Sequence, residues 1–107
     1  MAGSRAVSLD CEMVVTATER DAVAQVCIVD DRLCTLLKTY VRPRCSVIDY
    51  RTPLSGINSQ NLVGAPSLSE VVARVRPLLQ GRILVGHSVR KDLRALGISH
   101  PERDIRD

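Results

Sequence analysis

Hydrophobic and polar positions alternate through much of the first third of the chain, as they do in β-strands. Residues 6–14, 22–30 and 33–41 follow this alternation, and short polar turns separate them. Because short links favour antiparallel pairing, the pattern predicts a three-strand antiparallel meander. Pro43 should end its third strand.

Residues 42–66 lose this alternation and contain three prolines and two glycines. Such a stretch is typical of a long loop, which in a small domain is usually either functional or disordered. Its mix of hydrophobic residues argues against disorder. One short helix is expected within it, starting at Asn58 or Ser59 and ending at Gly64.

Helical spacing begins after this loop. Ser67 and Glu70 have the spacing of a capping box, which predicts a helix start. Apolar residues then recur at helical spacing up to Leu79. Pro77 should kink or end this helix, because proline disrupts helical hydrogen bonding.

The last third of the chain combines a short strand with a second helix. Residues 83–85 are all apolar, and a sharp turn leads into a helix that Ser88 should cap and Gly97 should close. Residues 100–107 resemble the approach to a further strand. A meander followed by a helix and a buried strand predicts an α/β fold with a mixed sheet, in which one parallel strand joins the meander and helices flank it.

Length and composition fit a single domain with an aliphatic core. The chain has 107 residues, is 45% hydrophobic, and contains only two aromatic residues, Tyr40 and Tyr50. So few aromatic rings argue against a broad platform for stacking bases. The net charge of +3 is compatible with a polyanionic partner but is too mild to indicate one.

The cysteine pattern indicates a reduced, intracellular setting. The four cysteines are irregularly spaced and form no C-x-x-C pair, so neither a zinc site nor a disulfide is required. No apolar run approaches the length of a membrane span, which excludes a membrane partner at this stage. Residues 1–5 do not resemble a signal peptide.

Two acids in the first strand are the strongest candidates for chemistry. Asp10 and Glu12 share one face of the strand, about 6.6 Å apart. Carboxylates in a buried strand need a partner, and a divalent cation would supply one. A bridging and an outer carboxylate are what a pair of metal ions requires. The alternative is an edge strand whose acids face water.

Asp92 is a third candidate, in the first turns of the helix that follows the strand at residues 83–85. It lies at the edge of that helix's buried stripe. Open α/β sheets place their ligands at this kind of strand end. The alternative is a solvated acid on a helix surface.

Several short motifs follow one another along the chain in a specific order. They are Leu9-Asp10-Cys11-Glu12-Met13-Val14, Val41-Arg42-Pro43, Asp49-Tyr50-Arg51-Thr52, Ser55-Gly56-Ile57, Leu84-Val85-Gly86-His87 with Asp92-Leu93, and His100-Pro101 with Arg103-Asp104. Each motif alone is weak, whereas their order and spacing are specific. Together they resemble the eukaryotic DEDDh-type 3′→5′ RNA exonucleases of the ribonuclease H-like fold, and within them the RNA exonuclease and interferon-stimulated exonuclease branch.

The resemblance implies an enzyme that removes nucleoside monophosphates from the 3′ end of single-stranded RNA, with DNA as a second candidate substrate. Asp10 and Glu12 match the family's first acidic motif and Asp92 the second, so they become the expected catalytic residues and ligands of two Mg²⁺ or Mn²⁺ ions. Met13 matches a position beside the terminal nucleotide, and Arg51 one that contacts its sugar. The alternatives are inward packing for Met13 and a surface charge for Arg51.

This chain also departs from the family pattern. Val15 and Ala17 stand where relatives commonly have glycine, which alters the loop beside the nucleotide site. The third motif, a general-base His followed by a metal-binding Asp, is missing. His87 precedes Asp92 by the same spacing but belongs to the second motif. We therefore interpret His87 as a packed or hydrogen-bonded turn residue and His100 as a surface loop residue.

Residues 1–107 are thus expected to be the N-terminal portion of an exonuclease domain, incomplete at its C-terminus, with a strand and helices missing. The resemblance implies an intracellular location, which is expected to be nuclear or nucleolar for the RNA-processing branch and cytoplasmic for the others. Two alternatives to an active enzyme remain. One is a catalytically inactive nucleic-acid-binding or interaction module on the same scaffold, and the other is a fragment with no function of its own.

Overall fold

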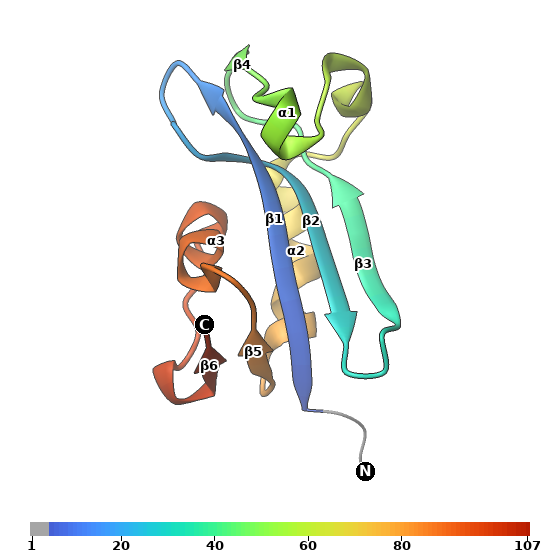
Figure 1. The fold of residues 1–107 in the computed structure, drawn as a ribbon, viewed down its shortest axis with the longest axis vertical. Coiled ribbons are helices and arrows are strands. Elements are labelled where there is room, and N and C mark those ends of the chain that lie inside the picture. Colours follow the sequence, from blue (N-terminus) through green and yellow to red (C-terminus); the bar gives the residue numbers. More distant parts are fainter. Residues whose placement is uncertain (1–4) are drawn as a thin grey trace.

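A computed structural model describes residues 5–107, and a six-stranded mixed sheet forms its centre (Figure 1). Its first three strands form the expected antiparallel meander: β1 (Ala6–Thr16), β2 (Ala22–Asp30) and β3 (Thr35–Tyr40). On the other side of β1 lie two short parallel strands, β5 (Ile83–Val85) and β6 (Ile105–Arg106). The strand order is therefore β3-β2-β1-β5-β6.

The meander agrees with the sequence pattern except at one turn. The third strand starts at Thr35 rather than at residue 33, because the turn occupies residues 31–34. The Asp30 carboxylate accepts hydrogen bonds from the backbone N–H groups of Arg32 and Cys34, both at 2.9 Å. Leu33 adopts a positive φ of 67° in this turn.

The loop-rich region folds on its own hydrogen bonds. A short strand, β4 (Val47–Asp49), pairs with the end of β1 and is followed by α1 (Thr52–Ser55), neither of which the sequence pattern predicts. The expected short helix is confirmed as the 3₁₀ helix η1 (Ser59–Leu62). Asn58 and Asn61 cap it reciprocally, through side-chain bonds to each other's backbone N–H at 3.1 and 2.8 Å.

Helix α2 (Leu68–Leu79) starts as predicted, with the Ser67 hydroxyl accepting from the Glu70 backbone N–H at 3.3 Å. Pro77 does not end the helix near Arg76, which is one of the two predicted outcomes, since the helix continues to Leu79. Pro77 lies in the last turn, and Ala73, whose carbonyl loses its helical partner, is exposed. Water can therefore solvate that carbonyl, which lowers the cost of proline there.

Helix α3 (Val89–Leu96) ends at Gly97 as predicted, but Ser88 does not cap it with its side chain. Ser88 has a positive φ of 56° and no side-chain cap bond. The Asp107 carboxylate instead accepts from the first backbone N–H groups of the helix, including that of Arg90 at 3.4 Å. The approach to a further strand is confirmed by η2 (Glu102–Asp104) and β6.

Helices α2 and α3 pack on the same face of the sheet and share one aliphatic core with it. A second, smaller cluster lies near α1 and η1; it contains Val14, Ala22, Ala24, Ile57 and Leu62. Among residues 5–107, no helix has the length and apolar character needed to cross a membrane.

The turn from β5 into α3 passes very close to β1. A Cβ added to Gly86 would lie 2.9 Å from the Leu9 carbonyl oxygen and 3.2 Å from the Val89 Cβ. Only glycine therefore allows this approach, which fixes the start of α3 against the middle of β1.

We expect Gly86→Ala to push this turn away from β1 and to destabilise the fold by about 1–3 kcal/mol. Thermal unfolding followed by circular dichroism measures this as a drop of several degrees in Tm, at roughly 4–8 °C per kcal/mol for a domain of this size. An unchanged Tm would contradict the close contact between Gly86 and Leu9.

Candidate functional site

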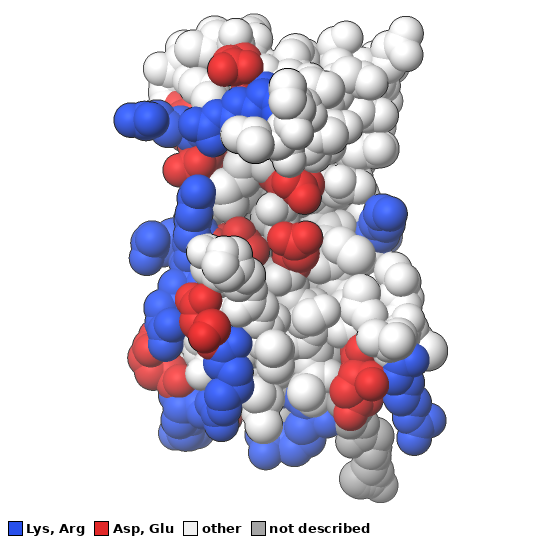
Figure 2. Space-filling model, in the orientation of Figure 1, with Lys and Arg blue, Asp and Glu red and all other residues white. Residues whose placement is uncertain are grey.

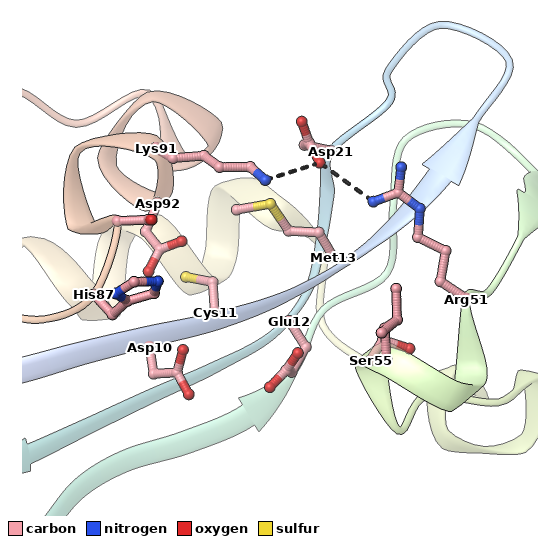
Figure 3. Close-up of a pocket in the computed structure, with 12 residues that line it drawn as sticks. Asp10, Cys11, Glu12, Met13, Asp21, Arg51, Ser55, His87, Lys91 and Asp92 are labelled. Atoms are coloured by element: carbon pink, nitrogen blue, oxygen red, sulfur yellow. Dashed lines mark ion pairs between the residues drawn. The ribbon is translucent and has the colours of Figure 1, made fainter.

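The edge of β1 that faces β5 is paired only through Ala6–Ser8. Beyond Ser8, β5 no longer pairs with β1, and α3 lies beside the strand (Figure 3). A cavity of about 350 Å³ opens there. Four segments line it: β1, the residue before β2, α1 with the residue before it, and α3 with the turn that leads into it. The lining residues are Asp10, Cys11, Glu12, Met13, Asp21, Arg51, Leu54, Ser55, His87, Ser88, Lys91 and Asp92.

All five site residues proposed from the sequence line this one cavity: Asp10, Glu12, Met13, Arg51 and Asp92. Figure 3 shows Asp92 on α3 facing the stretch of β1 that carries the two other acids. Figure 2 shows acidic side chains in the middle of this face of the molecule and basic ones over α3 and β6 at its left. The fold thus brings the three acids together, which their positions in the chain alone do not require.

A β-bulge between Glu12 and Met13 shapes this part of β1. Before the bulge Leu9 is buried, and after it Val14 and Thr16 are buried. The strict alternation expected for residues 6–14 therefore fails after Glu12. Because the bulge re-aims the side chains, neighbours on both faces of the strand can line the cavity.

The cavity raises the pKa of two of the carboxyl groups. Burial and the nearby Asp10 charge raise the pKa of Asp92 to about 6, although a hydrogen bond from the Cys11 backbone N–H and the Lys91 charge act in the opposite direction. Asp92 is only 6% exposed. Burial and the Asp10 charge also raise the pKa of Glu12. Negative charge is therefore concentrated here at a cost in free energy.

Cys11 lies among these acids but is a poor candidate for chemistry. Burial, together with the Asp92, Asp10 and Glu12 charges, raises the pKa of its thiol far above the ordinary value. The thiol stays protonated at neutral pH and is not a nucleophile. Its partial burial against the main core indicates a packing role.

The donor set suits a hard divalent cation, because it consists of carboxylate oxygens. Among residues 5–107, no group of three or more His, Cys, Asp or Glu side chains lies close enough together to hold a metal ion as the structure stands. Three like charges repel one another, and a bound cation would offset that repulsion. The residues present therefore fit a divalent metal by their chemistry.

The interpretation of His87 is wrong, whereas His100 lies in a loop as predicted but is more enclosed than a surface residue. His87 is exposed and lines the cavity, with no hydrogen bond found for its ring among residues 5–107. His100 is the half-buried, hydrogen-bonded one, since its Nε2 lies 2.8 Å from the Arg82 carbonyl oxygen. The residue after His87, Ser88, has a backbone φ of 56° in the left-handed region.

Sequence reasoning missed two charged residues of the cavity. Asp21, just before β2, lies 3.6 Å from Arg51 and 3.4 Å from Lys91. Neither Asp21 nor Lys91 belongs to the acidic motifs, and they are distant in sequence. Only the folded chain brings them together.

The sequence profile of the exonuclease family matches residues 7–97. The chain belongs to the exonuclease family. The chain is 47% identical to RNA exonuclease 4 of Neurospora crassa over 103 aligned residues. The aligned residues make up 94% of this chain and 25% of that protein. It is 42% identical to RNA exonuclease 4 of Homo sapiens over 106 aligned residues, which make up 97% of this chain and 25% of that protein. The chain therefore spans about a quarter of these relatives.

Solved structures confirm the ribonuclease H-like mixed sheet of this exonuclease chain. The Pan2 catalytic unit of Neurospora crassa matches with a TM-score of 0.83 and 19% identity, over 100% of this chain and 20% of that one. The Saccharomyces cerevisiae Pan2 RNA exonuclease module in complex with A7 RNA matches with a TM-score of 0.82 and 26% identity, over 97% of this chain and 20% of that one. Members of the exonuclease family generally use divalent metal ions.

Asp92→Asn tests the cost of the carboxylate cluster. The pKa of Asp92 is about 6 in the folded chain against an ordinary 3.8, so the folded state binds the proton more tightly than the unfolded state does. Stability contributed by protonated Asp92 is present below the ordinary pKa and is lost as pH rises through the folded pKa.

In the presence of EDTA, Asp92→Asn should therefore be about 1–2 kcal/mol more stable than the wild type at pH 7, allowing for solvent near the cavity mouth. The difference should shrink towards zero near pH 4. Urea unfolding at several pH values measures it. A variant that is less stable than the wild type at pH 7 would contradict this account of Asp92.

Proposed function

We propose that this chain carries the main part of the active site of a metal-dependent 3′→5′ exonuclease. The proposed reaction removes nucleoside monophosphates from single-stranded RNA, with DNA as a second candidate substrate. One observation carries the proposal: Asp92 of α3 lies buried in the cavity that Asp10 and Glu12 of β1 also line. Family membership and the RNA exonuclease names of similar proteins support it.

In this proposal Asp10, Glu12 and Asp92 would hold two Mg²⁺ or Mn²⁺ ions. When bound, such ions lower the pKa of a water molecule and stabilise charge on the leaving oxygen. The raised pKa values of Asp92 and Glu12 support this role, because a cation would stabilise the charged form of carboxyl groups that burial and neighbouring negative charge destabilise.

Met13 and Arg51 would position the terminal nucleotide. Met13 is half-buried against the main core, yet it also lines the cavity, so the packing and binding interpretations are compatible. The Arg51 guanidinium has five N–H donors, which can reach sugar hydroxyls or phosphate oxygens. Ser55 helps to fix this region, since its hydroxyl donates to the Tyr50 carbonyl at 2.7 Å and accepts from the Ile57 backbone N–H at 3.0 Å.

We also propose that residues 1–107 are the N-terminal portion of the exonuclease domain. The family's third motif, with its general-base His and further acidic ligand, has no match in this sequence. Loss of a general base lowers a rate by about 10²–10⁴-fold, so turnover by this chain alone should be slow. A nuclear or nucleolar location is part of the proposal and follows from the RNA-processing branch that the motifs resemble.

The second candidate is a catalytically inactive nucleic-acid-binding or interaction module. The missing third motif favours it over the enzyme. The two candidates differ in what they do to a bound strand, since the module would bind RNA and leave its length unchanged.

End-labelled single-stranded RNA incubated with Mn²⁺ separates the two. The proposal predicts stepwise shortening from the 3′ end, which should fall by on the order of 100-fold or more in Asp92→Asn, because metal-borne charge stabilisation is lost. Glu70→Gln is the control, since Glu70 is an exposed acid at the start of α2 and does not line the cavity. Binding without shortening would establish the inactive module instead.

A further inference from the structure

A bridge of three charged residues crosses the mouth of the cavity. One carboxylate oxygen of Asp21, Oδ1, lies 3.6 Å from the Arg51 guanidinium and 3.4 Å from the Lys91 ammonium. The three residues come from separate segments: the residue before β2, the residue before α1, and α3. In Figure 3 both ion pairs meet at Asp21, so this one acid connects the two cations.

The backbone of Arg51 is held in an uncommon conformation. Its φ is 51°, in the left-handed region that residues other than glycine seldom adopt. Its N–H donates to the Asp49 carboxylate at 2.9 Å, and its carbonyl accepts from the N–H groups of Leu54 and Ser55 at 2.8 Å each. Strained residues of this kind persist where the surroundings fix them, and they gather at functional sites.

The two cations keep donors free for a further anion. The side chains of Arg51 and Lys91 are 30% and 49% exposed. Arginine has five N–H donors and a lysine ammonium has three, whereas a single carboxylate oxygen pairs with both. Both residues line the cavity, so their remaining donors are available to a ligand that enters it.

The positive charges of Arg51 and Lys91 matter for a nucleic acid, because the other charged residues of the cavity are acids. Asp10, Glu12 and Asp92 repel a phosphate backbone unless cations offset them, whereas the bridge contributes two positive charges against one negative charge at the mouth. These two cations therefore offer attraction to a phosphate backbone in a cavity whose three acids repel it.

We propose that Asp21 is a positioning residue that holds Arg51 and Lys91 together as a cationic pair, and that Lys91 contacts a phosphate of the entering RNA strand. This inference rests on the proposed function and deepens it, because it assigns a phosphate contact and its support. A carboxylate that only repelled RNA would have the opposite effect on binding, so the two roles can be separated by sign.

The test is binding of a short fluorescein-labelled single-stranded RNA, followed by fluorescence anisotropy in EDTA at several KCl concentrations. Lys91→Met should weaken binding roughly 3–10-fold at low salt and reduce the slope of log K against log[KCl] by about 0.7, the value for one phosphate contact on a single strand. Lys91→Arg should keep the wild-type slope. Lys38→Met is the matched control: Lys38 is the chain's only other lysine, is exposed on β3 and does not line the cavity.

Asp21→Asn decides between the two roles of the carboxylate. The proposal predicts weaker binding and a smaller salt slope, although a negative charge has been removed from the site of a polyanion. Tighter or unchanged binding would overturn the positioning role and leave the exonuclease proposal standing. A wild-type chain that does not bind RNA even at the lowest KCl concentration would overturn the phosphate contact, whereas the proposed function is tested separately by the shortening of RNA in Mn²⁺. A melting curve of each variant shows that the fold is retained.

Discussion

Three carboxylates that line one cavity beside β1 repel one another, and this repulsion is the constraint around which the site is built. Asp10 and Glu12 come from the strand, and Asp92 is brought to them by α3. Asp92 is nearly buried, and its raised pKa of about 6 reflects both that burial and the Asp10 charge. Such an arrangement costs free energy of folding unless an opposite charge offsets it, so a positively charged ligand would account for it.

Local features of the backbone make this arrangement possible. The parallel pairing of β1 with β5 stops at Ser8, and α3 lies beside the residues of β1 that follow. Gly86 allows the β5–α3 turn to approach the Leu9 carbonyl, and the bulge after Glu12 turns side chains from both faces of β1 towards the cavity. The same stretch of chain thus loses regular sheet pairing and gains a site.

The charges around the cavity are arranged in two zones. The acids lie along β1 and on the inner side of α3, whereas Arg51 and Lys91 meet at Asp21 at the mouth. Such a separation suits a substrate that carries phosphate and also needs metal ions for its cleavage. In the proposed function, this separation would allow a chain with a net charge of only +3 to attract RNA locally.

Much of the fold and the positions of the five proposed site residues followed from the sequence. Period-two and helical spacing are local signals, so β2, β5 and the start of α2 were predicted closely. The motif order brought Met13 and Arg51 into consideration, which spacing alone would not have done. What failed depended on long-range contacts. The Asp107 carboxylate, rather than the Ser88 side chain, accepts hydrogen bonds from the first backbone N–H groups of α3. His100 rather than His87 has a hydrogen-bonded ring. Asp21 forms ion pairs with two cations that are distant in sequence.

Calorimetric titration of Mn²⁺ into the metal-free chain tests the central claim most directly. The account predicts saturable heat of binding at pH 7, lost in Asp92→Asn and retained in Glu70→Gln. It also predicts that affinity falls as pH drops through about 6, where Asp92 takes up a proton. No binding by the wild-type chain, or equal binding by Asp92→Asn, would contradict the claim that these three acids form a metal site.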